Sequence, residues 1–125
     1  DASADASVAK FPGNWKDLDA ELVRSATSGV AVTTDRWGFT YYLGREPDFV
    51  LGVEDPPAER IINDLQAFVD IVGQPSDVSL VTYGPQFFDD AFVSEEIRGY
   101  VLREFDRIDD GRDDVRIMVF RKRRP

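Results

Sequence analysis

The chain contains no cysteine and no histidine among its 125 residues. Without cysteine it cannot form disulfides, thiolate nucleophiles or cysteine-ligated metal sites. The absence of histidine is more restrictive, because imidazole is the side chain most used for proton transfer near neutral pH and for binding zinc. The glycine spacings of phosphate loops and dinucleotide sites are also missing. We therefore expect no catalytic residues, no metal site and no cofactor.

Long hydrophobic runs are missing as well. No apolar run approaches the ~18 residues that a membrane-spanning helix needs, and 42% of the residues are hydrophobic. A chain of this length fits one domain that buries roughly two-thirds of its unfolded surface. We expect a flexible leader at 1–12, a single domain at 13–120 and a basic tail at 121–125. The leader has small and polar residues, which fits either a plain flexible leader or the stub of a removed targeting segment, so the sequence identifies no compartment.

Charge is abundant and uneven. The chain has 17 Asp and 7 Glu against 12 Arg and 3 Lys, for a formal net charge of -9. Four of the cations are consecutive, at 121–124, so residues 1–120 carry 24 acids against 11 bases. A surface of this kind stays soluble through self-repulsion and suits high salt.

Hydrophobic periodicity and capping residues predict an α/β domain, with α+β as the alternative. We expect a mixed sheet of about five strands with three helices, in the order α-β-β-β-α-β-α-β. The first helix starts after Asn14, and a hairpin joins 30–34 to 37–43. The remaining elements are strand 49–53, helix 57–72, strand 77–83, helix 95–108 and strand 115–120. The expected core contains Ile61, Leu65, Phe68, Ile97, Val101, Phe105, Ile117 and Val119.

The densest acidic cluster is "DRIDDGRDD" at 106–114. Ile108 and Ile117 occupy the third and twelfth positions of a calcium loop that starts at Asp106, where oxygen ligands are required. We therefore interpret the segment as a helix-to-strand turn with Gly111 at the helix C-terminus. Weak cation binding by its aspartates is the alternative.

Three phenylalanines crowd the connection 84–93: Phe87, Phe88 and Phe92. This connection leaves the carboxyl end of a strand, which is where ligands bind in open α/β sheets. The rings either seal the end of the sheet, the interpretation that we favour, or present an apolar surface to a partner.

A second aromatic group lies in "TDRWGFTYYLG" at 34–44. Trp37 is expected beside a hairpin turn, and Tyr41 and Tyr42 are expected on opposite faces of a strand, so at least one ring lies outside the core. Exposed Trp and Tyr are typical interface anchors. A hydrophobic cover on an edge strand is the equally weighted alternative.

The tail contains Arg121, Lys122, Arg123 and Arg124. Four cations at an anionic lipid surface contribute ~4 kcal/mol, or roughly millimolar affinity, so peripheral lipid contact is weak. The acidic remainder of the chain opposes direct binding to nucleic acid. The tail is expected to pin the last strand to an acidic partner or to the protein's own acidic face, with a plain solubilising terminus as the alternative.

These features favour a non-catalytic protein–protein interaction domain, such as a small accessory subunit of a larger assembly. One alternative is a small-molecule or cation-binding domain with its site at 84–93. A second is an acidic mimic of nucleic acid.

Overall fold

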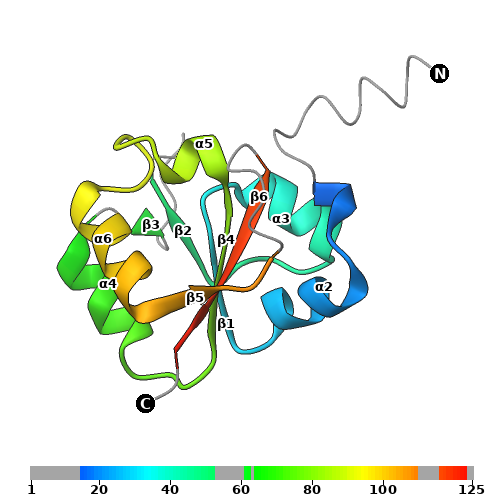
Figure 1. Cartoon of the computed structure of the whole chain (residues 1–125), viewed down its shortest axis with the longest axis horizontal. Helices are drawn as coiled ribbons and strands as arrows, with labels where there is room; N and C mark the ends of the chain where they lie inside the picture. The colour runs from blue at the N-terminus through cyan, green and yellow to red at the C-terminus, as the bar shows by residue number, and fades with distance from the viewer. Residues whose placement is uncertain (1–14, 53–60, 63, 110–115, 124–125) are drawn as a thin grey trace.

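A mixed sheet runs through the middle of the molecule, with helices on both faces (Figure 1). The computed structural model describes residues 15–52, 61–62, 64–109 and 116–123. In these ranges it has six strands in the order β3-β2-β1-β4-β6-β5. The predicted α/β class and mixed sheet are therefore confirmed. The strands are β1 Val30–Thr33, β2 Phe49–Leu51, β3 Ile61–Ile62, β4 Val78–Tyr83, β5 Phe105–Arg107 and β6 Ile117–Lys122.

Helices α4 and α6 cover one face of the sheet, and α2 and α3 cover the other (Figure 1). The helical elements are η1 Trp15–Asp17, α2 Ala20–Thr27, α3 Arg36–Leu43, α4 Leu65–Val72, α5 Gly84–Phe87 and α6 Glu95–Glu104. No helix in the described residues is long and apolar enough to cross a membrane.

Strands β1 to β4 are parallel, whereas β6 runs antiparallel to both β4 and β5. The crossover through α3 leads from β1 to β2, and the crossover through α4 leads from β3 to β4, in the opposite direction along the sheet. Two crossovers of the same handedness that run in opposite directions along a sheet place their helices on opposite faces. The direction in which strands are added changes between β1 and β4, which are neighbours in the sheet.

The alternating strands β4 and β6 supply both faces of the core. Leu80 and Phe120 pack under α4 and α6, whereas Val81 and Val119 pack under α2 and α3. Six of the predicted core residues are buried: Phe68, Ile97, Val101, Phe105, Ile117 and Val119. Leu65 is partly buried against the same core.

The predicted hairpin is wrong. Residues 36–43 form helix α3, with Asp35 as its N-cap and Gly44 after it in a left-handed conformation at φ 74°. The strand propensity of the aromatic residues is overridden because β1 and β2 are parallel. Parallel strands need a crossover and cannot be joined by a tight turn.

The predicted helix 57–72 is shorter than expected. Ile61 and Ile62 form β3. Helix α4 begins at Leu65, and Asp64 is its N-cap, because its side chain accepts a hydrogen bond from the Ala67 N–H. The expected start of this helix lies outside the described residues. The first helix also starts later than predicted, because Asp19 caps α2.

The predicted helix 95–108 ends at Glu104, and residues 105–107 form edge strand β5. Pairing with β6 accounts for the change, since Phe105 lies opposite Lys122. The prediction that Gly111 ends this helix is therefore wrong, because α6 ends at Glu104. Gly111 itself lies outside the described residues. Strand β6 extends to Lys122, so two residues of the expected tail belong to the sheet.

Candidate interaction site

Two aromatic side chains stand out on the surface of α3. Trp37 is 61% exposed and Tyr41 is 64% exposed. They are one helical turn apart, so they share one side of the helix. The sequence predicted that at least one ring among Trp37, Tyr41 and Tyr42 lies outside the core, although it placed Trp37 beside a hairpin turn and the tyrosines on a strand. We call Trp37 and Tyr41 the α3 aromatic face.

Buried rings support this face from behind. The Tyr41 ring packs edge-on against Tyr42 at 4.8 Å between centroids, and Tyr42 stacks on the buried Trp15 at 6.4 Å. Trp15 in turn meets the buried Phe39 edge-on. Tyr42 is therefore half-buried support, and the rings form a continuous series from the core to the surface.

Arg36 fixes the other end of the face. Its guanidinium lies 5.1 Å from the centre of the Trp37 ring and pairs with Glu46 at 3.1 Å. A cation over an indole contributes about 0.5–1 kcal/mol at an exposed site. Trp37 is thus exposed but held in place.

The N-cap of α3 is an acid in partly buried surroundings. Asp35 Oδ1 accepts a hydrogen bond from the Gly38 N–H at 3.1 Å. Its Oδ2 and the Trp15 Nε1 are buried, and neither has a hydrogen-bond partner among the described residues. Burial raises the pKa of Asp35 above its ordinary value of 3.8, while the Gly38 N–H, the nearby Trp15 indole and the Trp37 N–H lower it.

The connection 84–93 is ordered around Arg98. The Arg98 side chain donates to the carbonyls of Phe87 and Val93, each at 2.8 Å, and pairs with Asp90 at 2.8 Å. Phe87 is fully buried. The prediction that it contacts a partner at the surface of the free domain is therefore wrong, and the favoured interpretation, that this ring seals the core, agrees with its burial.

The other two phenylalanines of this connection lie nearer the surface. Phe88 is 49% exposed beside Arg98, whose guanidinium lies 6.0 Å from the ring centre. Phe92 is partly buried against the core.

The carboxyl ends of β1 and β4 hold a small polar cluster. The hydroxyls of Thr34 and Thr82 are 2.7 Å apart, and Thr34 donates to Gln86 Oε1 at 2.9 Å. A reversal of strand order is the usual position of a ligand site in such sheets. Here the polar groups bind one another instead, which gives no support to a ligand site at 84–93. No local sequence pattern indicates this cluster, because Thr34 is 48 positions from Thr82.

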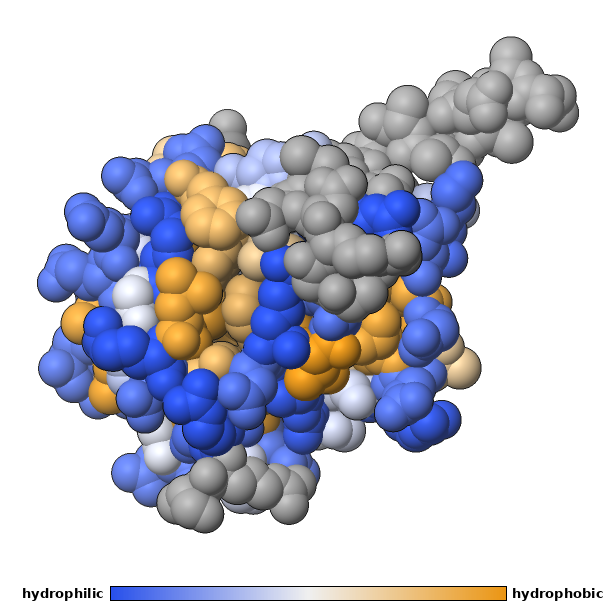
Figure 2. All heavy atoms as spheres, in the orientation of Figure 1, coloured by the Kyte–Doolittle hydropathy of each residue, from blue (hydrophilic) through white to orange (hydrophobic). Residues whose placement is uncertain are grey.

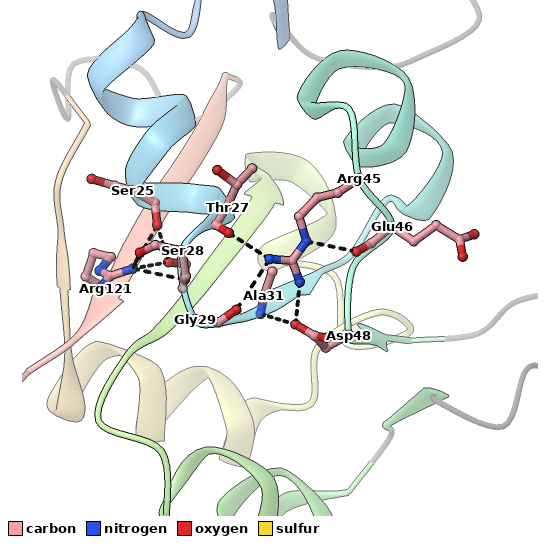
Figure 3. A network of polar contacts seen from close by, with 10 residues as sticks. Ser25, Thr27, Ser28, Gly29, Ala31, Arg45, Glu46, Asp48 and Arg121 are labelled. Atoms are coloured by element: carbon pink, nitrogen blue, oxygen red, sulfur yellow. Dashed lines mark hydrogen bonds and ion pairs between the residues drawn. The ribbon is translucent and has the colours of Figure 1, made fainter.

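Arg121 binds the C-terminal end of α2. Its Nη1 donates to the Ser25 carbonyl at 2.8 Å and to Ser79 Oγ at 2.7 Å, and its Nη2 pairs with Asp77 at 3.0 Å. Figure 3 shows Arg121 directed at this helix end. Arg45 holds the same end from the other side, through the Thr27 carbonyl at 2.7 Å. No sequence pattern singled out Arg45.

The next two cations serve two further helices. Lys122 Nζ donates to the Val72 carbonyl at 2.7 Å, at the end of α4. Arg123 Nη1 donates to the Arg103 carbonyl at 2.9 Å, in the last turn of α6, and Nη2 pairs with Asp106 at 2.9 Å. Arg124 lies outside the described residues.

Three consecutive cations therefore each contact the last turn of a different helix. The last carbonyls of a helix lack intrahelical partners and carry the negative end of its dipole, so cations stabilise them. The sequence analysis predicted contact with an acidic partner or with the protein's own acidic face. The described cations contact the domain itself, through helix-end carbonyls and through Asp77 and Asp106.

The described residues contain no cluster of three or more acids that could hold a metal ion. Asp109, from the acidic segment, pairs with Arg107 at 2.9 Å and accepts a hydrogen bond from the Val119 N–H. Asp110, Asp113 and Asp114 lie outside the described residues.

Comparison with known proteins adds no relative. No family model matches the chain, and no significant match was found among curated proteins or solved structures.

Proposed function

We propose that the chain is a non-catalytic protein–protein interaction domain, an accessory subunit of a larger assembly, and that the α3 aromatic face is its principal contact. The observation that carries this proposal is the exposure of Trp37 and Tyr41 on one side of a helix whose other rings are packed into the core.

The energetics favour such a contact. A Trp or Tyr side chain buries about 150–250 Å² when it is covered. Covering the exposed three-fifths of each ring releases about 2–4 kcal/mol per residue at ~25 cal/mol per Å². Both rings are already restrained, Tyr41 by Tyr42 and Trp37 by Arg36. Binding therefore loses little side-chain entropy, a cost that otherwise reduces the affinity of an interface.

The C-terminal cations are mainly structural in this proposal. Arg121 and Lys122 bind helix ends within the domain, whereas Arg123 is exposed. That the cation run also speeds docking to an acidic partner stays a prediction, and Arg123 is the described cation best placed for it. Phe88, exposed beside Arg98, is a second apolar contact that a large partner could cover.

Position-specific crosslinking tests the proposal. A photoreactive phenylalanine analogue is introduced at Trp37 or Tyr41 in the native source, and at Leu102 as the control. Leu102 is 55% exposed but lies on α6, across the sheet from α3. We expect one discrete crosslinked protein from both α3 positions and none from Leu102. Identical products at all three positions, or none on α3, would overturn the proposal.

A further inference from the structure

An open groove of about 500 Å³ lies between the start of α2 and strands β5 and β6. Its apolar lining comes from Leu18, Leu22, Ile108 and Ile117. Ile108 is 37% exposed, and apolar surface is visible between α2 and β5 in Figure 2. The volume lies within the range of ligand-binding clefts, which is about 300–1,000 Å³.

One wall of the groove is acidic. Asp17, Asp19 and Glu21 line it and are exposed. Asp19 also accepts a hydrogen bond from the Leu22 N–H at 2.8 Å, so it serves as the N-cap of α2. The positive end of the helix dipole, equivalent to about half an elementary charge, offsets only part of these three charges.

Two of the other charged residues in the described lining have partners of opposite charge. Arg121 is paired with Asp77, and Asp109 is paired with Arg107. Arg116 is the one further cation among the described lining residues, so the three carboxylates leave an excess of negative charge. The formal net charge of the whole chain is -9, and this charge adds to the attraction of a cationic partner.

We propose that this groove binds a basic, aliphatic segment of a partner protein. The aliphatic side chains of the segment cover Leu22 and Ile108, and its Lys or Arg side chains meet Asp17 and Glu21. Long cationic side chains suit a surface of this kind, because their stems are apolar and their ends are charged. The inference goes beyond the proposed function, since it names the chemistry of a second contact and rests on residues outside the α3 aromatic face.

A titration with a defined peptide tests this inference. The probe is the blocked peptide Lys-Leu-Arg-Ile-Lys, added to the ¹⁵N-labelled chain and followed by amide chemical shifts. We expect saturable shifts at Leu18, Leu22 and Ile108. The Asp17→Asn, Glu21→Gln double variant should bind about two- to thirty-fold more weakly, as expected for the loss of two exposed ion pairs. Asp19 is left intact because its loss would destabilise α2.

The matched control removes two acids from the first turn of another helix. Glu95→Gln with Glu96→Gln, on α6, should leave the affinity unchanged. Ile108→Ser should weaken binding while the remaining amide spectrum stays that of the folded chain.

Several outcomes would overturn the inference. These are equal binding of a peptide with Glu in place of its basic residues, equal binding of one with Ala in place of Leu and Ile, equal binding of spermidine, or no shift up to millimolar peptide. The Trp37→Ala, Tyr41→Ala variant should still bind the peptide, which distinguishes failure of this inference from failure of the proposed function.

Discussion

Replacing Arg121 with methionine should destabilise the domain by about 2–4 kcal/mol. The side chain is only 21% exposed and donates to Ser25, Ser79 and Asp77. Hydrogen bonds from charged groups contribute about 1.5–3 kcal/mol net. The helix-end charge adds about 0.3–1 kcal/mol, and the partly exposed ion pair with Asp77 adds at most about 1 kcal/mol. Since domains of this kind are stable by about 5–15 kcal/mol, the loss is a large fraction of the total.

Urea denaturation followed by far-UV circular dichroism measures this loss directly. Arg121→Lys should lose less than Arg121→Met, because one ammonium group cannot span both the Ser25 carbonyl and Asp77. The matched control is Arg24→Met. Arg24 is exposed on α2, the helix that Arg121 contacts, and its side chain has no hydrogen bond among the described residues. The control should change stability by no more than about 1 kcal/mol, because Arg24 lies in the last turn of α2 and only its interaction with the helix dipole is lost. Equal losses for Arg121→Met and Arg24→Met would refute the helix-capping role.

Three further outcomes test the fold around the site. Phe87→Ala should cost about 3–5 kcal/mol in urea denaturation because the ring is fully buried, and an equal cost for the half-exposed Phe88→Ala would contradict that assignment. Gly38→Ala should destabilise by about 1–3 kcal/mol through overpacking, since its Cβ would overlap Asp35 Oδ2 and lie 2.6 Å from Trp15 Nε1; a gain in thermal stability would show that the site can expand. The raised pKa of Asp35 contributes stability that is present below pH 3.8 and is lost as pH rises through the higher folded value. Asp35→Asn keeps the helix cap but does not titrate, so its free energy of unfolding should rise relative to that of the wild type between pH 3 and pH 7. A difference in unfolding free energy that does not change with pH would exclude the titration of Asp35.

Much of the fold is accessible from the sequence because its signals are local. The apolar stripe of α4 and the β-branched residues of β4 are local features, and both a helix and a strand were predicted there. Helix α3 was missed although Asp35 and Gly44 are its start and stop signals. The aromatic residues between them outweighed those signals, and the deciding factor, parallel pairing of β1 with β2, is nonlocal.

The site was predictable only in part. The sequence predicted only that at least one ring among Trp37, Tyr41 and Tyr42 lies outside the core, and the reason given was a strand that the structure replaces with helix α3. That Trp37 and Tyr41 are the exposed pair, on one side of a helix, required the structure. The partners of the C-terminal cations could not be found from the sequence, since Arg121 and the Ser25 carbonyl are 96 positions apart. The fold brings them together by placing β6 beside β4.

Native mass spectrometry of the protein isolated from its own source tests the interaction role most directly. The wild type, the Trp37→Ala, Tyr41→Ala variant and a Leu102→Ala control are compared at equal expression. We predict that the wild type and the control are recovered in the same assembly, whereas the double variant is recovered folded but unassembled. Recovery of the double variant in an unchanged assembly, or of the wild type without any partner, would contradict the account.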